Sequence, residues 1–237
     1  MAVSLPTLDG PAILVADGGA SAHAPDHSLE AFRLATRLGA TGLGLDVWSD
    51  PSDRLVVARR RIRVLRGRRR RRADTADAGD HLLLSHLLAE IPSGIALGAR
   101  VEERTSFAAL IQQVGAEGRC GDLWCRHSDL DELSAWSNEA PQAHFVFVID
   151  APPPAGSLER QVAQLRAANI DALEMRATNW TSGHVALAHR FGRHAWATDA
   201  DHPPVISRLL LGGLDAVVGR NVEHLVDTAG APHTDPR

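Results

Sequence analysis

Short apolar runs alternate with amphipathic helical patterns along most of the chain. The run at residues 144–149 contains Phe-Val-Phe-Val-Ile and is apolar throughout, which is typical of a buried parallel strand. Runs of this length favour strands over helices when turn residues flank them. The pattern predicts eight strands, at residues 13–16, 42–47, 94–99, 122–125, 144–149, 172–175, 195–198 and 215–218.

Helical periodicity fills the segments between and after these strands. Ser28 has the residue type of an N-cap for the first helix, and Pro92 ends the second. The predicted helices cover residues 29–38, 85–90, 106–114, 130–136, 158–168, 182–191, 204–211 and 222–227.

Eight strands alternating with eight helices predict an α/β fold, specifically a (β/α)8 TIM barrel. We expect one barrel over residues 1–229 and a frayed polar tail over residues 230–237. A doubly wound open sheet is the alternative. No Gly-x-Gly-x-x-Gly turn follows the first strand, so nothing favours dinucleotide binding.

Composition agrees with a globular domain and excludes some chemistries. The 237 residues are 44% hydrophobic and 23% charged, and they include no lysine and no tyrosine, which excludes Schiff-base catalysis. Cys120 and Cys125 give neither a disulfide framework nor a zinc pattern. The N-terminus lacks the features of a secretion signal and no apolar run is long enough to span a bilayer, so we expect a cytoplasmic protein without a transmembrane segment.

Charge is distributed unevenly along the chain. Ten of the 25 basic residues are arginines between Arg59 and Arg72, which leaves 15 arginines against 29 acidic residues elsewhere. Such a basic segment is suited to an anionic surface or a lipid headgroup. It contains no aromatic residue that could stack on bases, so nucleic acid is not an expected partner. The other interpretation is a loop without a binding role.

Several segments, in the same order along the chain, carry a family resemblance. Residues 16–32 read Ala-Asp-Gly-Gly-Ala-Ser-Ala-His-Ala-Pro-Asp-His-Ser-Leu-Glu-Ala-Phe, and residues 42–47 read Gly-Leu-Gly-Leu-Asp-Val. Residues 211–220 read Leu-Gly-Gly-Leu-Asp-Ala-Val-Val-Gly-Arg. These resemble the family motifs His-Arg-Gly-Ala-Ser, Ala-Pro-Glu-Asn-Thr-Leu-Glu-Ala-Phe, Gly-Leu-Glu-Leu-Asp-Val and Leu-Gly-Val-Asp-Gly-Ile-Ile-Thr-Asp. The chain is thus similar to the glycerophosphodiester phosphodiesterase family.

The resemblance implies a phospholipase C-like phosphodiesterase barrel. That family hydrolyses glycerophosphodiesters with two histidines as acid and base and with a divalent metal, often calcium or magnesium, held by carboxylates. In this sequence Asp17 stands at the position of the first histidine, and Gly18 at that of the adjacent arginine. Ala58 stands at the position of the second histidine, and Arg59 at that of the following aspartate.

The carboxylate positions have changed as well. Gly44 and Gly98 stand where the family has glutamates, and only Asp46 remains as a metal ligand. The Glu-Asn pair of the first loop has become Asp26-His27. One carboxylate cannot supply the six or more oxygens that calcium requires.

These replacements favour a catalytically degenerate family member without a metal cofactor. It would bind a phosphorylated or other anionic ligand, or a partner, and the candidate ligand contacts are Asp17, Asp46, Arg100 and Trp196.

An active phosphoric diester hydrolase with a rebuilt site is the first alternative. It would use acids at the strand ends and nearby histidines, which are Asp17, Asp46, Asp150, Glu174, Asp199, His23 and His27. An anionic-surface adaptor that binds through Arg59–Arg72 is the second alternative.

Overall fold

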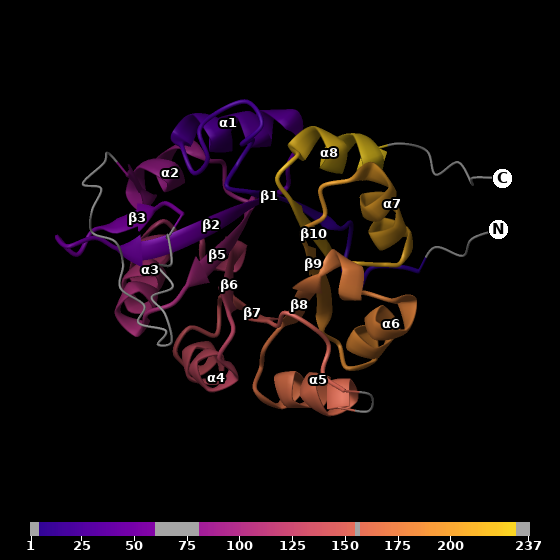
Figure 1. Cartoon of the computed structure of the whole chain (residues 1–237). Helices are drawn as coiled ribbons and strands as arrows, with labels where there is room; N and C mark the ends of the chain where they lie inside the picture. The colour runs from indigo at the N-terminus through magenta and orange to yellow at the C-terminus, as the bar shows by residue number, and fades with distance from the viewer. Residues whose placement is uncertain (1–4, 60–80, 155–156, 231–237) are drawn as a thin grey trace, which may run out of the picture.

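Eight parallel strands close into a barrel that helices surround (Figure 1). A computed structural model describes residues 5–59, 81–154 and 157–230 of the chain. The first strand pairs with both the last and the second, which closes the ring and excludes the open doubly wound sheet. The barrel strands are β1 (Ile13–Asp17), β2 (Gly42–Ser49), β5 (Ala96–Val101), β6 (Leu123–His127), β7 (His144–Val148), β8 (Ala172–Arg176), β9 (His194–Thr198) and β10 (Ala216–Gly219).

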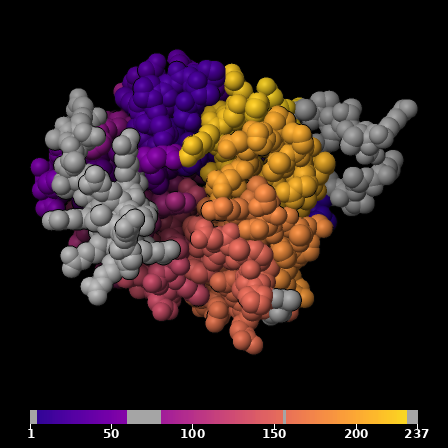
Figure 2. Space-filling model, in the orientation of Figure 1, coloured from indigo at the N-terminus to yellow at the C-terminus, as the bar shows by residue number. Residues whose placement is uncertain are grey.

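Each predicted helix is present, with its ends moved by at most three residues. Ser28 Oγ accepts a hydrogen bond from the Ala31 N–H, which confirms the predicted N-cap of the first helix. Figure 2 shows the first and last units of the barrel, indigo and yellow, side by side. The helices are α1 (Leu29–Leu38), α2 (Leu84–Glu90), α3 (Arg104–Ala116), α4 (Leu130–Glu139), α5 (Ser157–Ala167), α6 (Ser182–Arg190), α7 (Pro203–Leu211) and α8 (Val222–Gly230).

Two short strands that the sequence pattern did not predict extend β2 on one side of the barrel. These are β3 (Leu55–Val57) and β4 (Leu82–Leu83). The end of β2 pairs with β3 in antiparallel register, and β3 pairs with β4. Residues 60–80, which connect the two strands and contain most of the Arg59–Arg72 segment, lie outside the described residues. The predicted role of that segment therefore stays a prediction from sequence.

Side chains on the strands alternate between two cores, as the pleat of a strand requires. One face packs against the helices in a large apolar layer. The other face fills the barrel, where the rings of Trp124 and Trp196 lie 5.0 Å apart between their centroids. Small residues on neighbouring strands make room for these rings. The interior cluster consists of Val15, Ala96, Trp124, Val146, Ala172, Trp196, Ala216 and Val218.

Polar side chains at the N-terminal ends of the strands accept hydrogen bonds from the neighbouring backbone. Thr41 accepts from the Leu14 N–H at 2.9 Å, and Asp171 accepts from the Phe145 N–H at 2.8 Å. Asp215 accepts from the Ala195 N–H at 2.7 Å and is almost fully buried. These hydrogen bonds at the beginnings of the strands stabilise the barrel at the end opposite to the usual position of barrel active sites.

The remaining global expectations concern cysteines and membranes. Cys120 and Cys125 are free and buried, and burial raises the pKa of the Cys125 thiol well above its usual value. Within the described part of the chain, no helix combines the length and the apolar content needed to cross a membrane. Gly230, predicted as the first residue of the tail, is the last residue of α8. The rest of the predicted tail, residues 231–237, lies outside the described residues.

Candidate ligand-binding mouth

The C-terminal ends of the strands form a mouth lined by charged side chains. Strand alternation places the residue two positions after an interior residue on the same face. Val15 is therefore followed by Asp17, Trp124 by Arg126 and Val218 by Arg220. By the same rule, Asp46 follows Gly44 on β2 and Arg100 follows Gly98 on β5, so both charged side chains point toward the mouth. Barrel enzymes place their chemistry at this end.

Asp17 lies between two arginines. Its Oδ2 atom is 3.8 Å from Arg59 Nη2 and 4.0 Å from Arg220 Nε. Arg59 also donates a hydrogen bond to Asp26 Oδ2 at 2.8 Å. The side chain of Arg220 is 57% exposed, and ion pairs at such exposed positions contribute little to stability. The side chain of Arg59 is 40% exposed, so both guanidiniums are partly exposed at the mouth.

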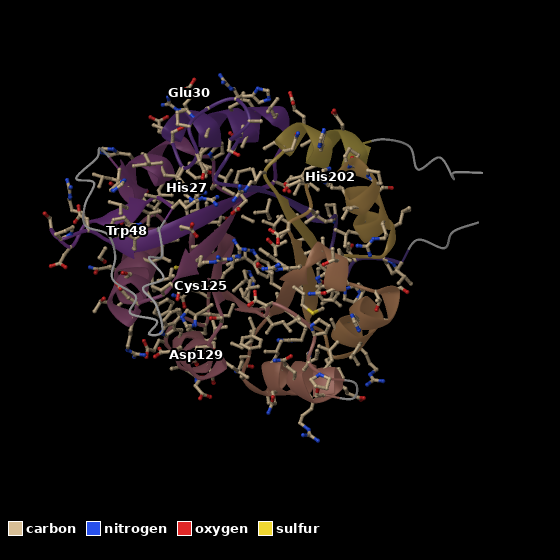
Figure 3. The ribbon with its side chains drawn as sticks, viewed as in Figure 1. His27, Glu30, Trp48, Cys125, Asp129 and His202 are labelled. Atoms are coloured by element: carbon tan, nitrogen blue, oxygen red, sulfur yellow. The ribbon has the colours of Figure 1, made fainter. Side chains whose placement is uncertain are left out.

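His27 is buried beside Asp46. The Asp46 N–H donates to His27 Nε2 at 3.3 Å, which assigns the ring proton of a neutral His27 to Nδ1. That Nδ1 atom lies 3.1 Å from Asp26 Oδ1, and Nε2 lies 3.8 Å from Asp46 Oδ2. His27 has a φ of 60°, a left-handed conformation that asparagine, aspartate and histidine adopt more readily than other non-glycine residues. Figure 3 shows His27 next to β2.

The other acids and histidines considered for a rebuilt site are not gathered around His27. His23 forms an ion pair with Glu223 at 3.2 Å. Asp150 and Asp199 lie at the other side of the mouth, each within 4 Å of Arg176. The structure thus brings together Asp17, Asp26, His27 and Asp46 but separates His23, Asp150 and Asp199 from them.

A buried ion pair lies beneath the mouth. Arg126 donates two hydrogen bonds to Glu174, from Nε at 2.8 Å and from Nη2 at 2.6 Å, and both side chains are almost fully buried. Burial lowers the pKa of Arg126, but the charge and hydrogen bonds of Glu174 and the charges of Asp17 and Asp46 outweigh this effect and raise it above its usual value. Glu174 was among the residues predicted from the sequence, and Arg126 was not. The missed signal was its inward position two residues after Trp124.

The remaining carboxylates do not fit a calcium or magnesium site. A Cβ atom at Gly44 would lie 2.8 Å from Asp17 Oδ1, and one at Gly98 would lie 3.6 Å from Arg126 Cδ. Among residues 5–59, 81–154 and 157–230, no group of three or more His, Cys, Asp or Glu side chains could hold a metal ion. Hard cations of this kind need six or more oxygen ligands.

The other predicted site residues differ in their exposure. Arg100 is exposed and lies in register with Asp46 on the neighbouring strand. Ala58 is buried, and its carbonyl accepts from Trp48 Nε1 at 3.0 Å. Trp196 was predicted from the sequence as a ligand contact, but its side chain is fully buried and packs against Trp124 inside the barrel. Trp196 lies on the interior face of β9, two residues before the strand ends, and this depth explains the difference.

A pocket of about 740 Å³ opens beside the mouth, between the β1–α1 loop and the β3–β4 extension. Asp26, His27 and Arg59 line one side of it, and His81 and His86 line the other. Pockets of this volume accommodate small organic ligands. The residues around His27 are therefore reachable from this side of the mouth.

Comparison with solved structures identifies the fold. The chain is similar to a glycerophosphodiester phosphodiesterase from Thermotoga maritima, with 20% identity and a TM-score of 0.72 over 92% of this chain and 99% of that one. It is also similar to an Oleispira antarctica phosphodiesterase in complex with the product sn-glycerol-3-phosphate, with 17% identity and a TM-score of 0.75 over 96% and 98% of the two chains.

A glycerophosphodiester phosphodiesterase from Agrobacterium tumefaciens gives a TM-score of 0.73 at 14% identity, over 93% of this chain and 100% of that one. The sequence matches no protein-family model and no curated protein. The chain therefore has the (β/α)8 barrel fold of the glycerophosphodiester phosphodiesterases.

Proposed function

We propose that this protein is a catalytically degenerate glycerophosphodiester phosphodiesterase that binds a phosphorylated small molecule in its barrel mouth without hydrolysing it. The observation that carries the proposal is the position of Asp17 between Arg59 and Arg220, at 3.8 and 4.0 Å. Both arginines stand in segments whose family motifs have an aspartate at that position. The replacement of two acidic residues by arginines thus makes the mouth better suited to an anion than to a cation.

The geometry supports an exchange of partners. A phosphate group accepts two parallel hydrogen bonds from one guanidinium and carries more charge than a carboxylate. The contacts of Asp17 with the two arginines are long and partly exposed, so an arriving phosphate competes for them at little cost. Arg100 is exposed near the same rim and adds a third donor.

The residues that replace the catalytic histidines support the absence of hydrolysis. Ala58 has no ionisable group, and Asp17 is engaged with arginines. A positioned acid or base contributes about two to four orders of magnitude in rate. Ligand binding would require no metal ion, because Asp17 and Asp46 already lie beside cationic or imidazole side chains.

Calorimetry with sn-glycerol-3-phosphate tests this proposal. We expect binding in the presence of EDTA and none for glycerol, which lacks the phosphate. Arg220→Gln should weaken binding by about tenfold, because it removes one charge-assisted hydrogen bond. Arg190→Gln, which removes an exposed arginine of α6 that pairs with Glu159, is the matched control and should not change the affinity.

Glycerophosphocholine, incubated with the protein and calcium or magnesium, should remain intact. Metal-dependent release of glycerol phosphate that disappears in Asp46→Ala would contradict the proposal. So would equal affinity for glycerol and its phosphate.

A second candidate function is an altered phosphodiester hydrolysis, which the contacts of His27 favour. Its ring lies between Asp26 and Asp46, and its Nδ1 atom is buried without a hydrogen-bond partner among the described residues. To act as a general base, His27 would release the Asp46 N–H from Nε2 and accept the substrate proton there. Under this alternative, His27→Asn should abolish turnover, since asparagine also adopts the left-handed conformation but transfers no proton. His23→Asn, on the same loop but paired with Glu223, should leave the rate unchanged. Equal rates in both variants would exclude His27 as the base.

A further inference from the structure

One buried guanidinium lies at the centre of the acidic groups beneath the mouth. Arg126 is held by two hydrogen bonds to Glu174, at 2.8 and 2.6 Å, and only 3% of its side chain is exposed. The charges of Asp17 and Asp46 also act on it. Three carboxylates from β1, β2 and β8 thus share the field of one positive charge from β6.

Arg126 also occupies the space next to the position of a missing carboxylate. A Cβ atom at Gly98 would lie 3.6 Å from Arg126 Cδ and 3.6 Å from Trp196 Cζ3. Any longer side chain at that position would have to pass along the arginine stem or the indole ring. The interior of the barrel therefore holds a cationic side chain next to the position where a metal site would need a ligand.

We propose that Arg126 is a built-in cation of this barrel, which takes the place of a divalent metal and excludes metal ions from Asp17, Asp46 and Glu174. A guanidinium stays protonated at any pH at which the protein is folded and needs no supply of metal. Its fixed hydrogen bonds to Glu174 hold it in one position. This inference goes beyond ligand binding, because it concerns the charge balance of the barrel whatever anion binds at the rim.

Terbium luminescence measures this exclusion. Terbium(III) binds carboxylate sites as calcium does, and a nearby indole such as that of Trp196 sensitises its emission. We expect Arg126→Gln to bind terbium at least about tenfold more tightly than the unchanged chain, because one positive charge is removed next to three carboxylates. Glutamine retains most of the stem and can still donate to Glu174.

Three variants make the result specific. Arg126→Lys keeps the charge and should titrate like the unchanged chain. Arg119→Gln removes another buried arginine, one that is bonded to Asp122 at the N-terminal end of the barrel, and should also show no gain. Adding Asp46→Asn to Arg126→Gln should abolish the gain.

The proposal is overturned if Arg126→Gln binds terbium no more tightly than the unchanged chain, or if Arg126→Lys or Arg119→Gln gains as much. Circular dichroism shows whether Arg126→Gln folds. If it does not fold, Gly98→Glu provides the test with Arg126 in place, because the added carboxylate then meets the guanidinium and should create no terbium site. A tenfold gain in Gly98→Glu would show that Arg126 does not exclude the cation.

Discussion

Glu174→Ala is expected to lower the free energy of unfolding by about 3–5 kcal/mol. Glu174 accepts both hydrogen bonds of Arg126, and both side chains are almost fully buried. Removing the glutamate leaves a guanidinium that cannot deprotonate in the barrel interior. Asp17 and Asp46 supply some compensating charge but no hydrogen bond to it. Urea denaturation, analysed for the transition midpoint at constant slope, measures the loss.

An exposed ion pair is the matched control for this effect. Glu159 pairs with Arg190 between α5 and α6, and 58% and 59% of the two side chains are exposed. Glu159→Ala should cost no more than about 1 kcal/mol. The double variant Arg126→Met with Glu174→Leu should recover most of the lost stability, because an apolar pair replaces the charges together. Equal losses for Glu174→Ala and Glu159→Ala would contradict the structural role of the buried pair.

Asp215→Asn is expected to destabilise the barrel by about 3 kcal/mol. The Asp215 carboxylate accepts from the backbone N–H groups of Leu8 and Ala195, and it lies 2.8 Å from His189 Nε2. An amide has only one acceptor oxygen, so one buried backbone donor would face an NH₂ group. Thermal unfolding followed by circular dichroism measures the change in midpoint.

The same carboxylate predicts a dependence of stability on pH. Burial raises the pKa of Asp215, but its interactions with His189 and His194 and its backbone hydrogen bonds outweigh burial and hold that pKa well below the usual range. The stabilisation is therefore present above the unfolded pKa of about 3.9, and it is lost as the pH falls below that value toward the folded pKa.

Asp215→Asn should remove part of this acid-induced loss. Asp171→Asn is the matched control, because Asp171 also accepts a backbone N–H at the start of a strand but is 31% exposed. Its replacement should cost less stability than that of Asp215. A larger effect at Asp171 than at Asp215 would be inconsistent with burial as the cause.

The order of elements could be predicted because hydrophobic periodicity is local. α1 was predicted with the observed ends, since Ser28 caps its start and Gly39, with a φ of 104°, ends it. β3 and β4 were missed because strands of three and two residues carry no periodic signal, and only pairing with the end of β2 makes them regular.

The candidate site was only partly predictable. The strand ends correctly placed Asp17 and Asp46 at the mouth, because residue alternation is visible in sequence. The sequence left the position of His27 open, and its contact with Asp46 depends on a loop that folds back from β1 onto β2. The depth of Trp196 inside the barrel could not be predicted, because the sequence does not show how far each strand extends toward the mouth.

The sequence by itself determined two things: the barrel fold, and the absence of the family's histidines and glutamates from the matching motif positions. Both follow from residue types at fixed positions along one strand or helix. The tertiary structure decided which charges meet: Arg126 with Glu174, and Asp17 with Arg59 and Arg220. These partners come from strands and loops far apart in the chain, so their distances exist only once the barrel has closed and set the register between its strands.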